Sequence, residues 1–382
     1  MLHKKIFSVI AFFIFSSFVI LPTNVLANII SCPAVGSPWT RTFLGDPVDM
    51  ATFGNHFYFL DRSNGPNGAA VVITEQGNWY GRRYGVVDNQ HLVTSYDNYY
   101  LTYPIQIPIN GCFSSPTSLY IEDYKIYVAD TGNHRVVQID IVKGIGEASN
   151  FSGWIGKDSN STASLHYWNA GDLNPISGTE GEDGSFIGPI AIAQKYDTLC
   201  VAENSGKDIR RLPKGYGKPW FTRWTSFSSI ARMRLALDTN VDVWFLYVLD
   251  GDQVKKISLV DGSVKASTPP QSSPLVALTS DSSHLYVADK AGHILALHLN
   301  DLSPAGGSGT PVLSDPRALA MATSAMATGY LYALDGKYVK SFKIEPVVKS
   351  IQRPRTRTFP TTTMTTRIFY KPLNTRLIPL KH

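Results

Sequence analysis

The chain has 382 residues, of which 43% are hydrophobic, and a formal net charge of +5. That length allows one large domain or two ordinary ones. Two lysines precede residue 28, and eight lysines and arginines follow residue 348. Residues 28–348 therefore hold 25 basic and 30 acidic residues. This acidic balance argues against a nucleic-acid-binding surface on that part of the chain.

The first segment has the pattern of an export signal. Lys4 and Lys5 precede an apolar run over residues 6–21, and Val25-Leu26-Ala27 has small residues at the outer positions of a cleavage site. The alternatives are an uncleaved membrane anchor, since sixteen residues are near the lower limit for a span, and lipidation at Cys32. We expect a signal peptide at 1–27 and an exported mature chain, periplasmic or secreted, without a membrane span.

A short apolar run that ends in an acid recurs six times along the chain. The six acids are Asp61, Asp130, Glu203, Asp250, Asp289 and Asp335. They lie 69, 73, 47, 39 and 46 residues apart, close to the roughly 40–50 residues of a propeller blade with two long insertions. We expect each carboxylate to bind backbone amides of the turn that follows it, a structural role and not a catalytic one.

Each run has a second short strand upstream, opened by a proline in five of the six copies, and a third strand downstream. Short strands at regular spacing without helical periodicity predict an all-β fold, here a six-bladed β-propeller over residues 28–346. We expect an N-terminal strand to close the ring, with 39–44 as the candidate and 366–370 as its rival. The basic tail, 347–382, is rich in Thr, Pro and Arg and has the composition of a disordered segment.

Residues 127–138 read Tyr-Val-Ala-Asp-Thr-Gly-Asn-His-Arg-Val-Val-Gln and resemble the NHL repeat, with Asn133-His134-Arg135 as the triplet that names it. Residues 152–157 resemble the outer-strand segment of that family, and 184–189 resemble its approach to the next blade. The resemblance covers roughly 45–346 and is most specific around 127–138. It implies a six-bladed propeller of NHL-type repeats.

One enzyme of that family, a lyase that acts in peptide amidation, binds zinc through histidines at the start of the inner strands. The matching positions in this chain hold no histidine; they are Val48, Thr117, Ile190, Leu275 and Arg317. Other six-bladed enzymes hold calcium in the channel through scattered oxygen ligands. The candidates for such a site are Asp49, Glu122, Asp238 and Asp281. They belong to the alternative function, a calcium-dependent hydrolase or lyase with its site in the channel.

Aromatic residues concentrate in the long connections at 77–115, 144–188 and 214–226. Tyrosine and tryptophan offer a large contact area with a hydrogen-bonding tip, so these connections predict an aromatic rim that binds a peptide, protein or glycan. The rim residues are Trp79, Tyr80, Tyr84, Tyr99, Tyr100, Trp154, Tyr167, Trp168, Trp220 and Trp224. The first hypothesis is therefore an exported, non-catalytic binding module without a cofactor, and calcium belongs to the alternative. The basic tail is first a solvated disordered end, with contact to an anionic surface as its alternative role.

The three cysteines do not suffice for a disulfide framework. Cys32 and Cys112 lie in connecting segments and are a candidate pair. Cys200 replaces the tyrosine of its repeat, so we expect it to be a buried thiol.

Overall fold

The computed structural model describes residues 29–31, 46–54, 56–62, 70–75, 78–87, 90–91, 94–95, 113–122, 124–141, 151–158, 175–176, 186–196, 198–213, 222–322 and 329–344. The predicted signal peptide, Cys32, Cys112, the tail and both candidate closing segments, 39–44 and 366–370, lie outside these ranges. Within them, no helix is long and apolar enough to span a membrane.

The described strands form six antiparallel sheets. The first sheet comprises β2 (Pro47–Phe53), β3 (His56–Asp61), β4 (Ala70–Glu75), β5 (Asn78–Val87) and β6 (Gln90–His91), with β7 (Thr94–Ser95) also paired to β5. The second comprises β8 (Ser118–Glu122), β9 (Lys125–Asp130), β10 (Arg135–Asp140), β11 (Phe151–Asp158) and β12 (Pro175–Ile176). The third comprises β13 (Ala191–Lys195), β14 (Thr198–Glu203), β15 (Asp208–Pro213) and β16 (Thr222–Trp224).

The other three sheets repeat the same order. The fourth comprises β17 (Ile230–Asp238), β18 (Val243–Asp250), β19 (Gln253–Ser258) and β20 (Val264–Ser267). The fifth comprises β21 (Leu275–Ser280), β22 (His284–Asp289), β23 (Ile294–His298) and β24 (Pro304–Gly307). The last comprises β25 (Pro316–Met321), β26 (Tyr330–Asp335), β27 (Tyr338–Ile344) and, at its outer edge, β1 (Ile29–Ser31).

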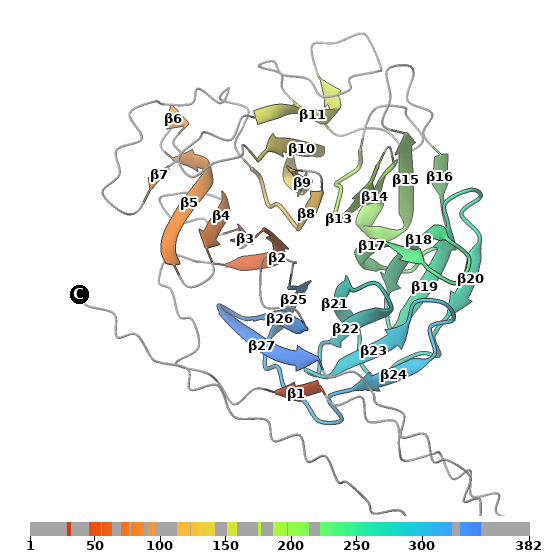
Figure 1. The fold of residues 1–382 in the computed structure, drawn as a ribbon. Helices are drawn as coiled ribbons and strands as arrows, with labels where there is room; N and C mark the ends of the chain where they lie inside the picture. The colour runs from red at the N-terminus through yellow and green to blue at the C-terminus, as the bar shows by residue number, and fades with distance from the viewer. Residues whose placement is uncertain are drawn as a thin grey trace, which may run out of the picture.

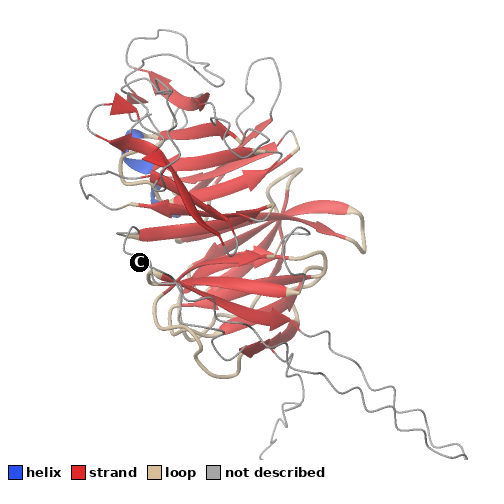
Figure 2. Ribbon diagram, turned by 60° about the vertical axis from the view of Figure 1, so that its left-hand side comes forward, coloured by secondary structure: helices blue, strands red, loops and turns tan. Residues whose placement is uncertain are grey.

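The inner strands of the sheets form a ring around one axis (Figure 1). β2 contacts β8, β8 contacts β13, and the series continues through β17, β21 and β25 back to β2. Almost all the described elements are strands, and the short helical turns η2 (Thr131–Asn133) and η3 (Asn204–Gly206) lie to one side of the assembly (Figure 2). The chain is an all-β β-propeller, as the sequence predicts.

The second strand of each sheet is buried on both faces because it lies between two neighbouring sheets. β3, β9, β14, β22 and β26 all have a half-buried first residue followed by five buried ones. A short continuous apolar run, without alternation, is the pattern expected of such a strand. Cys200 of β14 is fully buried, as predicted, and burial raises the pKa of its thiol to about 12.

The acids that end these second strands are structural, as predicted, but among the described residues the backbone donors to Asp130, Glu203, Asp250 and Asp335 lie upstream and not in the following turn. Asp130, for example, accepts a hydrogen bond from the Ser114 amide at 2.6 Å, which lies upstream of the inner strand of the same sheet. Asp61, Glu203, Asp250 and Asp335 likewise bind upstream amides. Asp289 binds the following turn as expected, through the His293 amide. The second strand ends where the chain enters its sheet, so the upstream amides are the nearest donors.

Most of these acids also face a base at the start of the third strand. The fully buried Asp130 carboxylate lies 2.7 Å from Nε of Arg135, and Glu203 pairs with Arg210 at 2.5 Å. Lys255 and Lys340 serve Asp250 and Asp335 in the same way. A charge buried in this way requires such a partner, so the pairs hold the second and third strands together.

The N-terminus contributes an edge strand to the last sheet. β1 pairs antiparallel with β27, with Ile29 opposite Ile344 and Ser31 opposite Phe342. The sequence predicts that an N-terminal strand completes the ring, with residues 39–44 as the candidate. The strand that pairs with β27 is instead Ile29–Ser31, which lies earlier in the chain.

Candidate functional site

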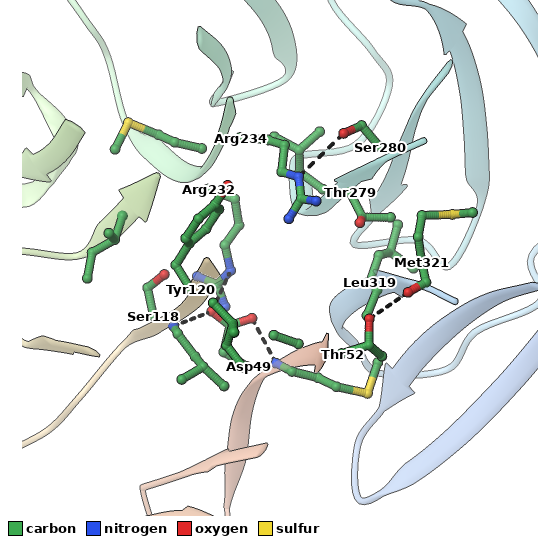
Figure 3. A pocket seen from close by; sticks show the side chains of 18 of the residues that line it. Asp49, Thr52, Ser118, Tyr120, Arg232, Arg234, Thr279, Ser280, Leu319 and Met321 are labelled. Carbon is green, nitrogen blue, oxygen red and sulfur yellow. Dashed lines mark hydrogen bonds and ion pairs between the residues drawn. The ribbon is translucent and has the colours of Figure 1, made fainter. Parts of the chain in front are cut away.

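A cavity of about 280 Å³ lies on the axis of the ring and is lined by the inner strands of all six sheets (Figure 3). On β2, β21 and β25 its lining reaches the end of the strand or the residue before it, at Thr52, Ser280 and Met321. The turns that follow the inner strands make up one face of the propeller, which we call the inner-turn face. The cavity therefore extends toward this face.

The side chain of Arg232 crosses the channel at the other end of the cavity. Arg232 belongs to β17, and its Nη2 donates to the carbonyl of Val48 on β2 at 2.8 Å and to that of Arg317 on β25 at 3.5 Å. β2 lies three strands from β17 in either direction around the ring. Arg232 thus connects opposite sides of the propeller, and we call it the floor of the cavity.

Asp49 is the buried acid beside this floor. Its Oδ2 lies 3.8 Å from Nε of Arg232, and it accepts hydrogen bonds from the amides of Leu119 and Met50 at 2.8 and 2.9 Å. Burial raises the pKa of Asp49 above its ordinary value, and the charge of Arg232 and the amide donors only partly reverse the rise. Asp49 and Arg232 therefore form an ion pair at this end of the cavity.

Arg234 lies two residues beyond Arg232 on β17 and points into the cavity between Tyr120 and Thr279 (Figure 3). Its Nε donates to Oγ of Ser280 at 3.4 Å, and its Cζ lies 5.5 Å from the centroid of the Tyr120 ring. These contacts direct the guanidinium toward Ser280 and the Tyr120 ring. The two terminal nitrogens make no hydrogen bond that the structure records, which leaves donors available in the cavity.

Three hydroxyl groups lie near Arg234 in the cavity lining. Ser280 already accepts from Arg234 and retains its own proton to donate. Thr279 and Tyr120 supply the other two, and burial raises the pKa of Tyr120, so its phenol is protonated at neutral pH. By contrast, Thr52 donates to the carbonyl of Met321 and is engaged in the wall.

The four acids proposed as calcium ligands do not form one site. Asp49 and Asp281 line the cavity, but Asp281 accepts hydrogen bonds from the hydroxyl of Tyr286 at 2.8 Å and from two amides of its own turn. Glu122 forms an ion pair with Lys195, and Asp238 pairs with Lys256 at 2.5 Å. No group of three or more His, Cys, Asp or Glu suited to a metal occurs within the described ranges.

Most of the predicted aromatic rim lies where side chains are not described. Trp79, Tyr80 and Tyr84 belong to β5, and Trp154 belongs to β11, where the structure places the backbone alone. Tyr99, Tyr100, Tyr167, Trp168 and Trp220 lie outside the described residues. Trp224 is 6% exposed and packs in the core beside Gly262, so the prediction that it lies at an open rim is wrong.

A different set of apolar side chains is exposed on the inner-turn face. Among the described residues, the exposed large hydrophobic side chains are those of Tyr124, Tyr196, Val241, Val243, Val260, Val264 and Tyr338. The first four lie at turns that follow inner strands, and Val260 and Val264 lie at the β19–β20 turn, which antiparallel pairing places on the same face. Only Tyr338, after the β26–β27 turn, lies on the opposite face.

Two tyrosines of this face have backbone conformations that suit glycine. Tyr124 has φ of 59° and Tyr196 has φ of 47°. The matching turn positions in other sheets are Gly54 for Tyr196, and Asp242 and Gly329 for Tyr124, all at positive φ. A bulky residue in the left-handed region carries strain, and such positions are concentrated at functional sites. The spacing of the repeat gave no sign of this substitution, although comparing the turns would have shown it.

Aromatic contacts join these turns across neighbouring sheets. The ring centroids of Tyr124 and Phe53 are 4.8 Å apart, and those of Tyr196 and Trp244 are 5.7 Å apart, both in edge-to-face geometry. Nζ of Lys195 lies 5.1 Å from the Tyr196 ring centroid and 5.2 Å from that of Trp244. Four consecutive sheets thereby present an aromatic arc, defined here as Phe53, Tyr124, Tyr196 and Trp244, on the face toward which the cavity extends.

Comparisons with known proteins do not assign a family to this chain. No family model matches it, and no curated protein matches it. Among solved structures, the computationally designed Ika8 protein covers 79% of this chain and 97% of its own, at 12% identity and a TM-score of 0.45. Apo AztD from Citrobacter koseri covers 76% of this chain and 80% of its own, at 11% identity and a TM-score of 0.46.

Proposed function

We propose that this chain is a non-catalytic binding module and that its inner-turn face contacts a peptide or protein partner. The observation that carries the proposal is the sidedness of the surface: six of the seven exposed large hydrophobic side chains among the described residues lie on that face. Exposed apolar side chains that gather on one face of a domain favour an interaction surface there. Tyrosine and tryptophan are also the side chains that contribute most to protein interfaces.

The strained tyrosines support this assignment. A turn that accepts glycine, as at Gly54, gains nothing for folding from a tyrosine at positive φ with its ring exposed. The ring of Tyr196 is 62% exposed, so its apolar area becomes buried only in a complex. Binding to a partner therefore gives a reason for the backbone strain of these tyrosines, whereas folding alone gives none.

The finer identity of the scaffold is part of the same proposal. We count each of the six sheets as one blade, in agreement with the six repeats, and assign the repeats to the NHL type. Support comes from the Asp130–Asn133–Arg135 unit, in which Asn133 and Arg135 both donate to Oδ2 of Asp130 at 2.8 and 2.7 Å. Export rests on the N-terminal pattern, which predicts a periplasmic or secreted module.

Site-specific photo-cross-linking tests the assigned face. Benzoylphenylalanine placed at Tyr196 is expected to form an adduct with a partner in cells that produce the protein, because that side chain lies in the proposed interface. The same group at Tyr338 is the matched control, since this tyrosine is also exposed, at 41%, but lies on the opposite face. Adducts are read as mass-shifted bands and identified by mass spectrometry.

Adducts from position 338 and none from position 196 would show that the partner binds elsewhere. A silent position 196 alongside a folded, exported protein would equally remove the basis for the proposal. Replacing Trp244 with serine in the protein that carries the cross-linker at 196 provides a second readout, because the adduct should weaken if the arc acts as one surface.

A further inference from the structure

We propose that the axial cavity is a binding site for a small monocarboxylate and that Arg234 is its ionic contact. The inference does not depend on a protein partner, because it rests on the cavity and not on the surface around it. The terminal nitrogens of the Arg234 guanidinium point into a cavity of about 280 Å³ and make no recorded hydrogen bond.

The position of Arg234 is fixed although its terminal nitrogens have no recorded partner. Nε donates to Oγ of Ser280, and Cζ of the guanidinium lies over the Tyr120 ring. These two contacts already direct the side chain into the cavity, which lowers the cost of ordering it when a ligand binds. An arginine that served only to stabilise the ring would be engaged by carbonyls, as Arg232 is.

The other charges of the cavity are already committed. Arg232 is bound to the carbonyls of Val48 and Arg317 and faces Asp49. Asp281 is directed to Tyr286 and to amides of its own turn. Arg234 is therefore the one cationic group in the described lining that retains several free donors.

These donors suit a carboxylate better than a phosphate. The two parallel N–H groups of a guanidinium match the two oxygens of a carboxylate in a planar, bidentate pair. A phosphate dianion would need a second free cation, and the nearest one, Arg232, is occupied. The hydroxyls of Ser280, Thr279 and Tyr120 can donate to the remaining lone pairs of a monoanion.

The rest of the ligand is small and carries no further charge. The cavity is slightly below the roughly 300 Å³ at which ordinary ligand pockets begin. Its lining includes Leu319, Met321 and Leu278, which offer no charge to an organic group beyond the carboxylate. A short aliphatic acid, or the carboxylate side chain of a larger ligand that enters from the inner-turn face, fits these constraints.

Titration with butyrate, followed by saturation-transfer NMR, tests the site. Butyrate should bind the unmodified protein, whereas butyramide, which has the same shape without the charge, should bind at least about tenfold more weakly. Arg234→Met should reduce butyrate affinity to the level of butyramide. Arg234→Lys keeps the charge but loses the planar pair, so its affinity should fall between the two.

Lys207→Met is the matched control, because it removes an exposed positive charge near η3, away from the cavity. Its butyrate affinity should equal that of the unmodified protein. The proposal is overturned if butyrate and butyramide bind equally, if butyrate fails to bind, or if Lys207→Met weakens binding as much as Arg234→Met. The amide comparison requires no substitution, so it remains decisive even if Arg234→Met does not fold.

Discussion

Replacing Arg135 with methionine is expected to lower the free energy of unfolding by about 4 kcal/mol, which is typical of a broken buried ion pair. Arg135 and Asp130 are both fully buried, with Nε and Oδ2 2.7 Å apart. Methionine leaves the Asp130 carboxylate in the core with only the donors of Ser114 and Asn133. Burial already raises the pKa of Asp130, so little stabilisation of its charge remains once Arg135 is removed.

Urea unfolding measures this loss, and Arg62→Met is the control. Arg62 pairs with Asp46 at 3.0 Å, but the two side chains are 45% and 36% exposed. An exposed pair contributes only about 0–1 kcal/mol because solvent screens it. If the two variants lose the same amount, the buried pairs do not hold the sheets together in the way described.

Replacing Arg232 with methionine should cost about 2 kcal/mol, the value of a hydrogen-bonded charged group in a partly buried place. Its Nη2 connects β17 to the opposite strand β2 through the Val48 carbonyl. Arg234→Met should cost much less, because Arg234 makes one hydrogen bond of 3.4 Å. Urea midpoints for the two variants therefore distinguish the structural arginine from the one that is free for a ligand.

The loss caused by Arg232→Met should also depend on pH. Without the arginine, the pKa of Asp49 in the folded state rises further above its unfolded value of about 3.9. An acid with a raised folded pKa favours folding when protonated, and this contribution is lost as pH rises from the unfolded to the folded pKa. The variant should therefore weaken relative to the unmodified protein as pH rises from the folded-state pKa of Asp49 in the unmodified protein to the higher pKa in the variant. Adding Asp49→Asn should abolish this dependence, and persistence of the trend in the double variant would contradict it.

The sequence predicts the scaffold well because the repeat is local. Each second strand, such as Ile126-Tyr127-Val128-Ala129-Asp130, carries its apolar run and terminal acid within a few residues. The bonding partners of those acids are not local: Asp130 binds Ser114, sixteen residues upstream. The sequence pattern identifies the acids that need hydrogen-bond donors. It does not identify the donors, because only the folded ring places them beside the acids.

The cavity was missed for a related reason. Histidines and acids do not mark the cavity in the sequence. Its signal is Arg232-Met233-Arg234, because two bases at alternate positions of a mostly apolar strand are an unusual pattern. Their different roles depend on strands far away in sequence, since Arg232 reaches β2 and β25, whereas Arg234 meets Ser280. Only the closed ring makes one arginine structural and leaves the other available.

A crystal structure of the protein with 4-bromobutyrate tests most directly whether the axial cavity is a ligand site. The account predicts an anomalous bromine peak in the cavity, with both carboxylate oxygens about 2.8 Å from the terminal nitrogens of Arg234. Arg232 should keep its bonds to Val48 and Arg317, as the floor of the cavity. A bromine peak confined to the surface, or a cavity in which Arg234 has turned away to bind a carbonyl, would contradict the account.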